Sequence, residues 1–167
     1  PGIKYVEKVK GYCKKYKIKN YKIEHFEINQ ELGPDIRIER SQEIIRQYIL
    51  ISNIDIWFSW ECDQIIPANA LDKLVSIMQA GDFMMVLANA GARWDPTIHN
   101  TNMGVTLIKR GCLKKNWFLP KRNGKISFNI SDSYNIHESM FKKRVLRSGG
   151  NYIEIFGVIK PIYHLNK

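Results

Sequence analysis

The stretch IDIWFSWECDQIIPANALDKLVSIM occupies residues 54–78. Its first part, residues 54–60, is rich in apolar and aromatic side chains and predicts a β-strand. Pro67 suits the first turn of a helix, and the apolar residues that follow it recur at helical spacing. We therefore expect a strand, a short polar step and a helix in direct succession.

The same alternation of strands and helices extends through the rest of the chain. Apolar periodicity predicts strands near residues 21–28, 83–87, 103–108, 152–156 and 158–163, and helices near residues 4–16, 35–52, 111–117 and 134–147. Helices between strands imply right-handed crossover connections. We expect an α/β fold with a mainly parallel central sheet flanked by helices, as a single domain over residues 1–167. The polar stretch 88–102 is expected to be a long loop, and long loops in compact domains are often functional.

The charge balance of the chain is basic. Its 167 residues include 26 Lys and Arg against 16 Asp and Glu, which gives a formal net charge of +10. Such a surface attracts polyanions, whether nucleic acid, anionic lipid headgroups or diphosphate substrates. The alternative is that lysine serves simply as the solvated surface residue.

The cysteine pattern bears on the compartment. Cys13, Cys62 and Cys112 lie far apart and form no CxxC pair, which argues against a disulfide framework and against a zinc knuckle. A reducing compartment is the simplest interpretation. No secretory signal is visible, and no window reaches the roughly 20 apolar residues that a membrane-spanning helix needs. We expect a cytoplasmic protein.

The polar segment that follows the predicted strand over residues 54–60 carries two carboxylates, Glu61 and Asp63. If the backbone stays extended there, side chains two residues apart point the same way. Two neighbouring carboxylates repel each other unless a cation lies between them, and Mg²⁺ and Mn²⁺ prefer such oxygen ligands. An ion held by one or two protein carboxylates keeps positions open for substrate phosphates. An exposed acidic turn is the alternative.

The stretch 54–78 resembles the signature region of GT-A glycosyltransferases, especially the family 2 type. Those enzymes carry an apolar strand, an acid-x-acid motif, a hydrophobic-Pro step and a helix. Four further stretches resemble that family in the same order: RIERSQEIIRQYIL (37–50), NTNMGVTLIKRGCL (100–113), NIHESMFKKRVLRSGGNYIEI (135–155) and PIYHL (161–165). The resemblance covers most of residues 37–165, with Glu61 where the family usually has Asp.

The resemblance implies a metal site. Asp63 would bind Mn²⁺ or Mg²⁺ directly, and Glu61 would bind it directly, through water, or contact the donor ribose instead. His164, in the stretch similar to the closing strand of the family, would complete the site. A lone histidine near a chain end is more often a surface or core residue, and that alternative stays open for His164.

The resemblance also implies groups that handle the substrates. Arg40, in an Arg-Ser pair, would contact the donor. Glu138 falls where the catalytic base of the family would be, and Asp132 is the fallback base. The alternatives are a first-turn carboxylate favoured by the helix dipole for Glu138 and a helix cap for Asp132.

The implied partners are a nucleotide-diphosphate sugar donor and an acceptor that is a glycan, a lipid-linked molecule or a protein. Association with membrane surfaces is compatible with this set, and no nucleic acid is expected. GT-A domains open with a strand that contacts the nucleotide base, whereas residues 1–3 lead directly into the first helix. We therefore expect that strand to be missing or to lie before Pro1.

Two other classes of function remain open at this point. A nucleic-acid-binding module would use the positive charge, although Lys and Arg are spread along the chain without an RNP, KH or helix-turn-helix pattern. Another metal-dependent nucleotidyl or phosphoryl transferase would use the same carboxylates. The P-loop class is excluded, because the sequence has no GxxxxGK[ST] motif.

Overall fold

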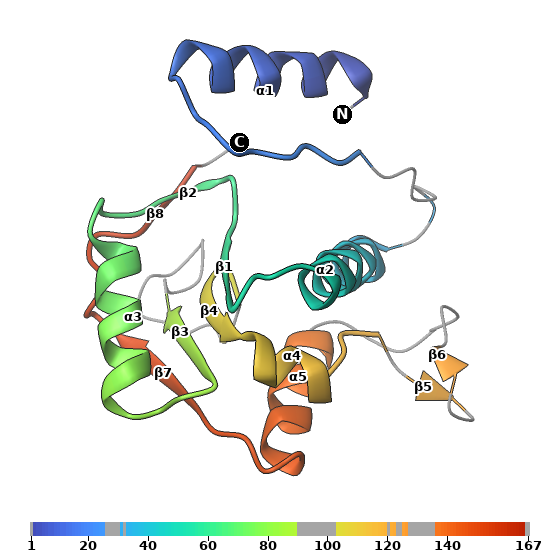
Figure 1. Cartoon of the computed structure of the whole chain (residues 1–167), viewed down its shortest axis with the longest axis vertical. Helices are drawn as coiled ribbons and strands as arrows, with labels where there is room; N and C mark the ends of the chain where they lie inside the picture. Colours follow the sequence, from blue (N-terminus) through green and yellow to red (C-terminus); the bar gives the residue numbers. More distant parts are fainter. Residues whose placement is uncertain are drawn as a thin grey trace. The chain divides into compact units, whose positions relative to one another are not determined.

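A computed structural model of the chain describes residues 2–25, 31, 33–89, 103–119, 121–122, 125–126 and 136–165 (Figure 1). The chain divides into two compact units, Pro1–Gly33 and Pro34–Lys167. The second unit contains the whole stretch that resembles a glycosyltransferase. Within the described ranges, no helix combines the length and the apolar character needed to cross a membrane.

The first unit is built on helix α1, Ile3–Lys15, as the apolar periodicity predicts. After the helix, the chain runs back along it as an extended segment (Figure 1). The strand predicted for residues 21–28 is not formed in its described part, residues 21–25. A strand needs a hydrogen-bonded neighbour, and none of the described strand pairs includes this segment.

The second unit is organised around a four-stranded sheet in the order β1-β4-β3-β7. Its strands are β1 (Ile56–Trp60), β3 (Met85–Asn89), β4 (Val105–Lys109) and β7 (Tyr152–Phe156). Strand β4 runs antiparallel to both β1 and β3, and β3 runs parallel to β7. The α/β class is confirmed, but the described sheet is mixed and not mainly parallel. Parallel neighbours need a crossover, usually a helix, whereas the sequence predicts only a loop between β3 and β4.

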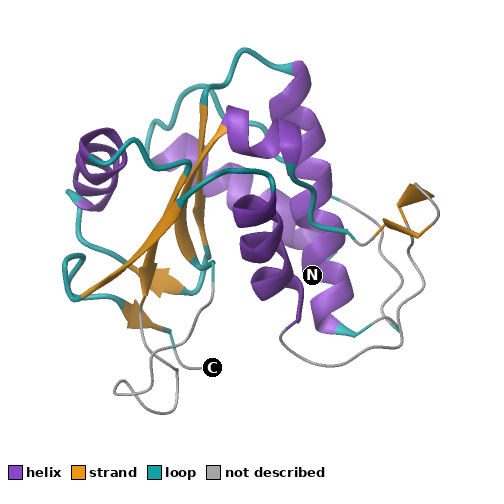
Figure 2. Cartoon of the chain, turned by 90° about the horizontal axis from the view of Figure 1, so that it is seen from below, coloured by secondary structure: helices purple, strands orange, loops and turns teal. Residues whose placement is uncertain are grey.

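Four helices cover the two faces of this sheet, and Figure 2 shows helices on both sides of it. They are α2 (Pro34–Ile51), α3 (Ala70–Ala80), α4 (Arg110–Lys115) and α5 (Ile136–Arg147). Helix α3 packs on one face, and α2, α4 and α5 contribute to the core on the other. Each of these helices was predicted from the sequence, to within a few residues at the ends.

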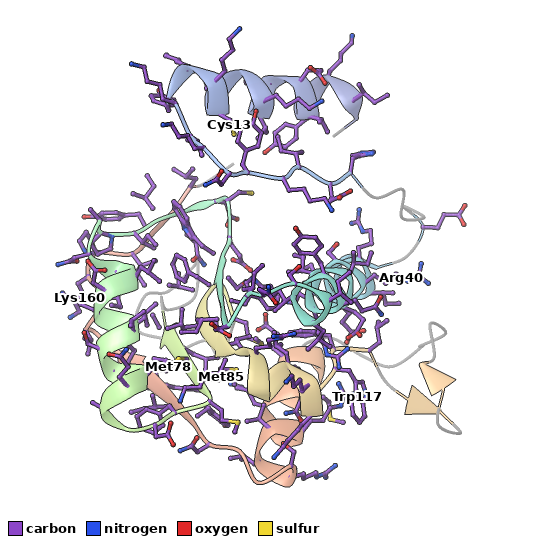
Figure 3. The ribbon with its side chains drawn as sticks, in the orientation of Figure 1. Cys13, Arg40, Met78, Met85, Trp117 and Lys160 are labelled. Carbon is purple, nitrogen blue, oxygen red and sulfur yellow. The ribbon has the colours of Figure 1, made fainter. Side chains whose placement is uncertain are left out.

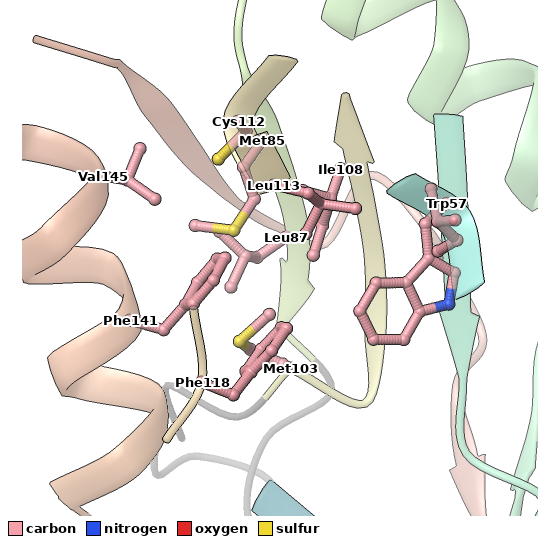
Figure 4. Packing of buried hydrophobic residues seen from close by; sticks show 11 residues of the cluster. Trp57, Met85, Leu87, Met103, Ile108, Cys112, Leu113, Phe118, Phe141 and Val145 are labelled. Carbon is pink, nitrogen blue, oxygen red and sulfur yellow. The ribbon is translucent and has the colours of Figure 1, made fainter. Parts of the chain in front are cut away.

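The alternation of side chains along the strands divides the core in two. Met85 and Leu87 point to one face of β3, and Val86 and Ala88 point to the other. The first cluster, called here the α2-side core, contains Ile49, Trp57, Met85, Leu87, Met103, Ile108, Cys112, Leu113, Phe118, Phe141 and Val145 (Figure 4). The second, the α3-side core, contains Ala70, Leu74, Met78, Val86, Ala88, Val105, Leu107, Ile155 and Ile159.

Two short antiparallel ribbons complete the described structure, and the sequence predicted neither pairing. Strand β2 (Gln64–Ile65) pairs with β8 (Tyr163–His164), and β5 (Lys121–Arg122) pairs with β6 (Lys125–Ile126). The strand expected over residues 158–163 is reduced to β8. Of the expected loop 88–102, only the two residues that end β3 are described.

Candidate functional site

Glu61 and Asp63 leave β1 through a tight turn. The backbone N–H of Glu61 donates a 2.9 Å hydrogen bond to the carbonyl of Gly104, which extends the pairing of the two chains beyond β1 and β4. The N–H of Gln64 donates to the carbonyl of Glu61 at 3.1 Å, and residues 62 and 63 form the turn between them. The condition of an extended backbone across the two carboxylates is therefore not met, because the chain turns there to enter β2.

Local contacts fix the position of the Glu61 carboxylate. Its Oε2 accepts a 3.1 Å hydrogen bond from Nε2 of Gln64, a residue that is only 2% exposed. Gly104 makes room for both groups, because a Cβ at this position would lie 2.3 Å from Nε2 of Gln64 and 2.9 Å from Oε2 of Glu61. The sequence predicted a role for Glu61 but not for Gln64 or Gly104, since neither belongs to a recognisable motif.

A pocket of about 370 Å³ lies beside Glu61. Trp57, Ser59 and Glu61 line it from one face of β1 and its extension, because alternate residues on a strand share a face. The remaining lining residues are Arg37, Ile38, Ser41, Gln42 and Ile45 from α2, together with Met103. A mainly apolar wall with a few polar groups is typical of small-ligand sites of this size.

Asp63 is half-buried and does not line this pocket. Its carbonyl accepts a 2.7 Å hydrogen bond from the N–H of Leu165, and the backbone of His164 pairs with Gln64. The closing strand therefore lies against the acidic turn, although the side chain of His164 is outside the described part of the structure. Among the side chains that are described, no group of three or more His, Cys, Asp or Glu could hold a metal ion.

Arg40 is half-buried on α2 (Figure 3) but does not line the pocket. Its neighbour Ser41 does, and the hydroxyl of Ser41 donates a 2.9 Å hydrogen bond to the carbonyl of Arg37. Arg37, one helical turn before Ser41, is the cationic residue of the pocket lining. The helix that the sequence singled out lines the pocket, but the structure puts Arg37 and not Arg40 in the wall.

Glu138 lies half-buried in the first turn of α5. It precedes by three residues Phe141, whose ring stacks on that of Phe118 with centroids 4.2 Å apart. The ring of Phe118 meets Trp57, a pocket-lining residue, edge to face at 5.8 Å. An aromatic row therefore connects the start of α5 to the pocket, on the same side of the sheet (Figure 4). Asp132 lies outside the described residues.

Buried charges hold the chain that follows α4 against α2 and α5. The carboxylate of Glu43, a residue 2% exposed, accepts hydrogen bonds from Nη1 of Arg46 at 2.7 Å and from the N–H of Phe118 at 3.0 Å. Arg144 donates from Nη1 to the carbonyl of Phe118 at 2.9 Å. Burial lowers the pKa of the Arg144 guanidinium, while the carboxylates of Glu39 and Glu43 act in the opposite direction. These contacts fix Phe118 beside the pocket wall.

No protein-family model, no curated protein and no solved structure matches the chain. The functional interpretation therefore depends on the residues of the site and on the resemblance of the sequence motifs.

Proposed function

We propose that the chain is a metal-dependent glycosyltransferase of the GT-A type, which moves a sugar from a nucleoside-diphosphate donor to an acceptor hydroxyl. One observation carries the proposal. Glu61 lines a pocket at the end of β1, and Asp63 follows in a turn that is hydrogen-bonded to the strand carrying His164. These are the residues that the resemblance assigns to the metal of the nucleotide-sugar.

The chemistry of the acidic turn suits a divalent cation. Glu61 and Asp63 offer hard oxygen ligands, and the space left by Gly104 lets the Glu61 carboxylate lie against the backbone. These two residues would hold Mn²⁺ or Mg²⁺ and leave positions open for phosphate oxygens. The ion would stabilise the negative charge that develops on the departing nucleoside diphosphate.

The remaining side chains have roles that follow from their positions. Arg37 would contact an anionic part of the donor, and Trp57 and Met103 would exclude water from the pocket. Glu138, at the start of α5, would accept the proton of the acceptor hydroxyl if the reaction inverts the anomeric carbon. The acceptor would be a glycan, a lipid-linked molecule or a protein. We place the reaction in the cytoplasm, because three free cysteines suit a reducing compartment.

The test is the thermal stability of the chain with Mn²⁺ and uridine or guanosine diphosphate. A ligand at one hundred times its dissociation constant stabilises the folded state by about 2.7 kcal/mol. For a chain of this length we expect the melting temperature to rise by roughly 5 °C or more with one of the diphosphates. Asp63→Asn, by weakening the affinity about tenfold or more, should cut the rise by about half or more. Asp72→Asn, which alters an exposed acid on α3, should preserve it.

A wild-type melting temperature that does not respond, or an equal rise in Asp63→Asn, would contradict the proposal. Analysis of the reaction products distinguishes a glycosyltransferase from the rival class, a nucleotidyl transferase. Transfer of the sugar to an acceptor, or its slow release to water, supports a glycosyltransferase. Formation of pyrophosphate or of a new sugar nucleotide would instead indicate a nucleotidyl transferase.

A further inference from the structure

Helix α1 carries a row of tyrosines along one face. Tyr5, Tyr12 and Tyr16 are spaced at i, i+7 and i+11, which places them on the same side of the helix. Their exposed fractions are 48%, 48% and 65%, and the rings of Tyr12 and Tyr16 stack with centroids 6.4 Å apart. Cys13 lies on a neighbouring face and is buried, and its carbonyl accepts a 2.9 Å hydrogen bond from the N–H of Ile18 in the returning segment (Figure 3). About half or more of each tyrosine is therefore exposed, whereas the unit buries Cys13 on the neighbouring face.

A row of lysines runs beside the tyrosines. Lys4, Lys8 and Lys15 share a face by their spacing at i, i+4 and i+11. Nζ of Lys8 lies 6.0 Å from the ring centroid of Tyr12, and Nζ of Lys15 lies 5.3 Å from that of Tyr16. The helix thus presents paired ammonium groups and amphipathic rings on adjoining faces.

Positive charge is concentrated around this helix. Residues 2–25 contain eight lysines and two glutamates, a net charge of +6 out of +10 for the whole chain. Residues 2–25 therefore hold more than half of the net charge in a small fraction of the length. A surface of this kind attracts a polyanion.

We propose that α1 docks on an anionic lipid surface, with its axis in the plane of the interface. Tyrosine is enriched at the headgroup level of membranes, and lysines beside it bind anionic headgroups through Coulomb attraction. Single-stranded RNA is the less favoured partner, because bases stack on open ring faces. In α1, the rings of Tyr12 and Tyr16 already face each other and their flanking lysines.

The experiment measures co-sedimentation of the full chain with vesicles of phosphatidylcholine, with and without phosphatidylglycerol, over a range of salt concentrations. We expect binding only to the anionic vesicles, and binding that weakens as salt rises. Lys8→Gln combined with Lys15→Gln should reduce the partition coefficient about 30-fold. Tyr12→Ser combined with Tyr16→Ser should remove the binding that persists at high salt.

A matched pair of substitutions makes the test specific. Lys114 and Lys115 are exposed in α4, so Lys114→Gln combined with Lys115→Gln removes the same charge from the second unit. Vesicle binding close to wild type in this control supports the proposal. An equal loss in both lysine pairs, no vesicle binding by the wild type, or tighter binding to oligouridylate that the α1 pair abolishes would overturn it.

Discussion

The two faces of the four-stranded sheet differ in what is buried against them. On one face, α3 packs through Ala70, Leu74 and Met78, and none of the buried polar residues in the described parts belongs to that helix. On the other face, α2 buries Glu39 and Glu43 beside the apolar cluster. The pocket and Glu61 also lie on this second face.

The comparison indicates which face of the sheet carries the candidate site in this unit. Apolar packing is the main attachment of α3, beside an exposed hydrogen bond from Lys73 to the carbonyl of Val158, and it contributes stability without directing a group at the pocket. On the α2 side, hydrogen-bonded charges fix one arrangement of the helices and of the chain beside the pocket. A buried ion pair gains little free energy over an apolar pair but costs much when one partner is removed. The two faces should therefore respond differently to substitution.

The largest effect is expected from Glu43→Ala. The change leaves the largely buried guanidinium of Arg46, its side chain 12% exposed, and the N–H of Phe118 without this carboxylate, and breaking a buried pair costs about 3–5 kcal/mol. Urea denaturation followed by circular dichroism would measure the free energy of unfolding. A loss below about 1 kcal/mol would mean that the network is not the organising feature of this face.

A slightly smaller effect is expected from Leu74→Ala on the opposite face. Leu74 is fully buried in the α3-side core, and such truncations cost about 2–5 kcal/mol through lost burial and the remaining cavity. Binding of Mn²⁺ and nucleoside diphosphate by the folded fraction should be unchanged. If the substitution abolished that binding, the functional division between the two faces would be wrong.

Cys112 gives the α2 side a sensitivity to alkaline pH. Burial raises the pKa of its thiol from an ordinary value of 9.0 to about 11. The unfolded chain therefore ionises first, so the stabilisation is complete below pH 9 and is lost as pH rises through about 11. The shift corresponds to roughly 2–3 kcal/mol.

The measurement for Cys112 is urea denaturation at several pH values between 8 and 11. The free energy of unfolding of the wild type should fall more steeply with pH than that of Cys112→Ala, whatever their values at pH 8. Parallel pH profiles for the two proteins would show that the thiol is not protected by burial.

The smallest effect is expected from Asp82→Asn. Oδ1 of Asp82 lies 2.6 Å from Nζ of Lys109, and this pair lowers the pKa of the carboxyl group, yet the Asp82 side chain is 95% exposed. Water and salt screen such pairs, and asparagine tolerates the positive φ of 47° at this position. We expect no measurable change in the urea midpoint at neutral pH. A loss comparable to that of Glu43→Ala would contradict the distinction between buried and exposed charge.

The sequence predicted most elements of the fold because their signals are local. The apolar run before Glu61 and the helical spacing after Pro67 are each visible in a single window, and β1 and α3 follow from them. The mixed sheet could not be predicted, since pairing of β4 with both β1 and β3 depends on contacts between distant segments. The strand expected over residues 21–28 failed in its described part for the same reason, because periodicity cannot supply a hydrogen-bonded neighbour.

The candidate site was predictable only in part. Glu61 and Asp63 stand out in the sequence as paired acids. The turn between them, however, is set by β2 and its pairing with β8, and no local sequence pattern predicts that pairing. Gly104 gains its importance only because the chain before β4 passes beside Glu61 and Gln64. Such positions are identified by spatial proximity and not by residue type.

Direct measurement of Mn²⁺ binding tests the central proposal most closely. Electron paramagnetic resonance follows the signal of free Mn²⁺ as the chain is added in the presence of the stabilising nucleoside diphosphate. The wild type should take up one ion per chain, while Glu61→Gln and Asp63→Asn should each weaken the affinity about tenfold or more. Asp72→Asn should bind as the wild type does. No uptake by the wild type, or equal affinity in all four proteins, would contradict the assignment of Glu61 and Asp63 as the ligands of a catalytic cation.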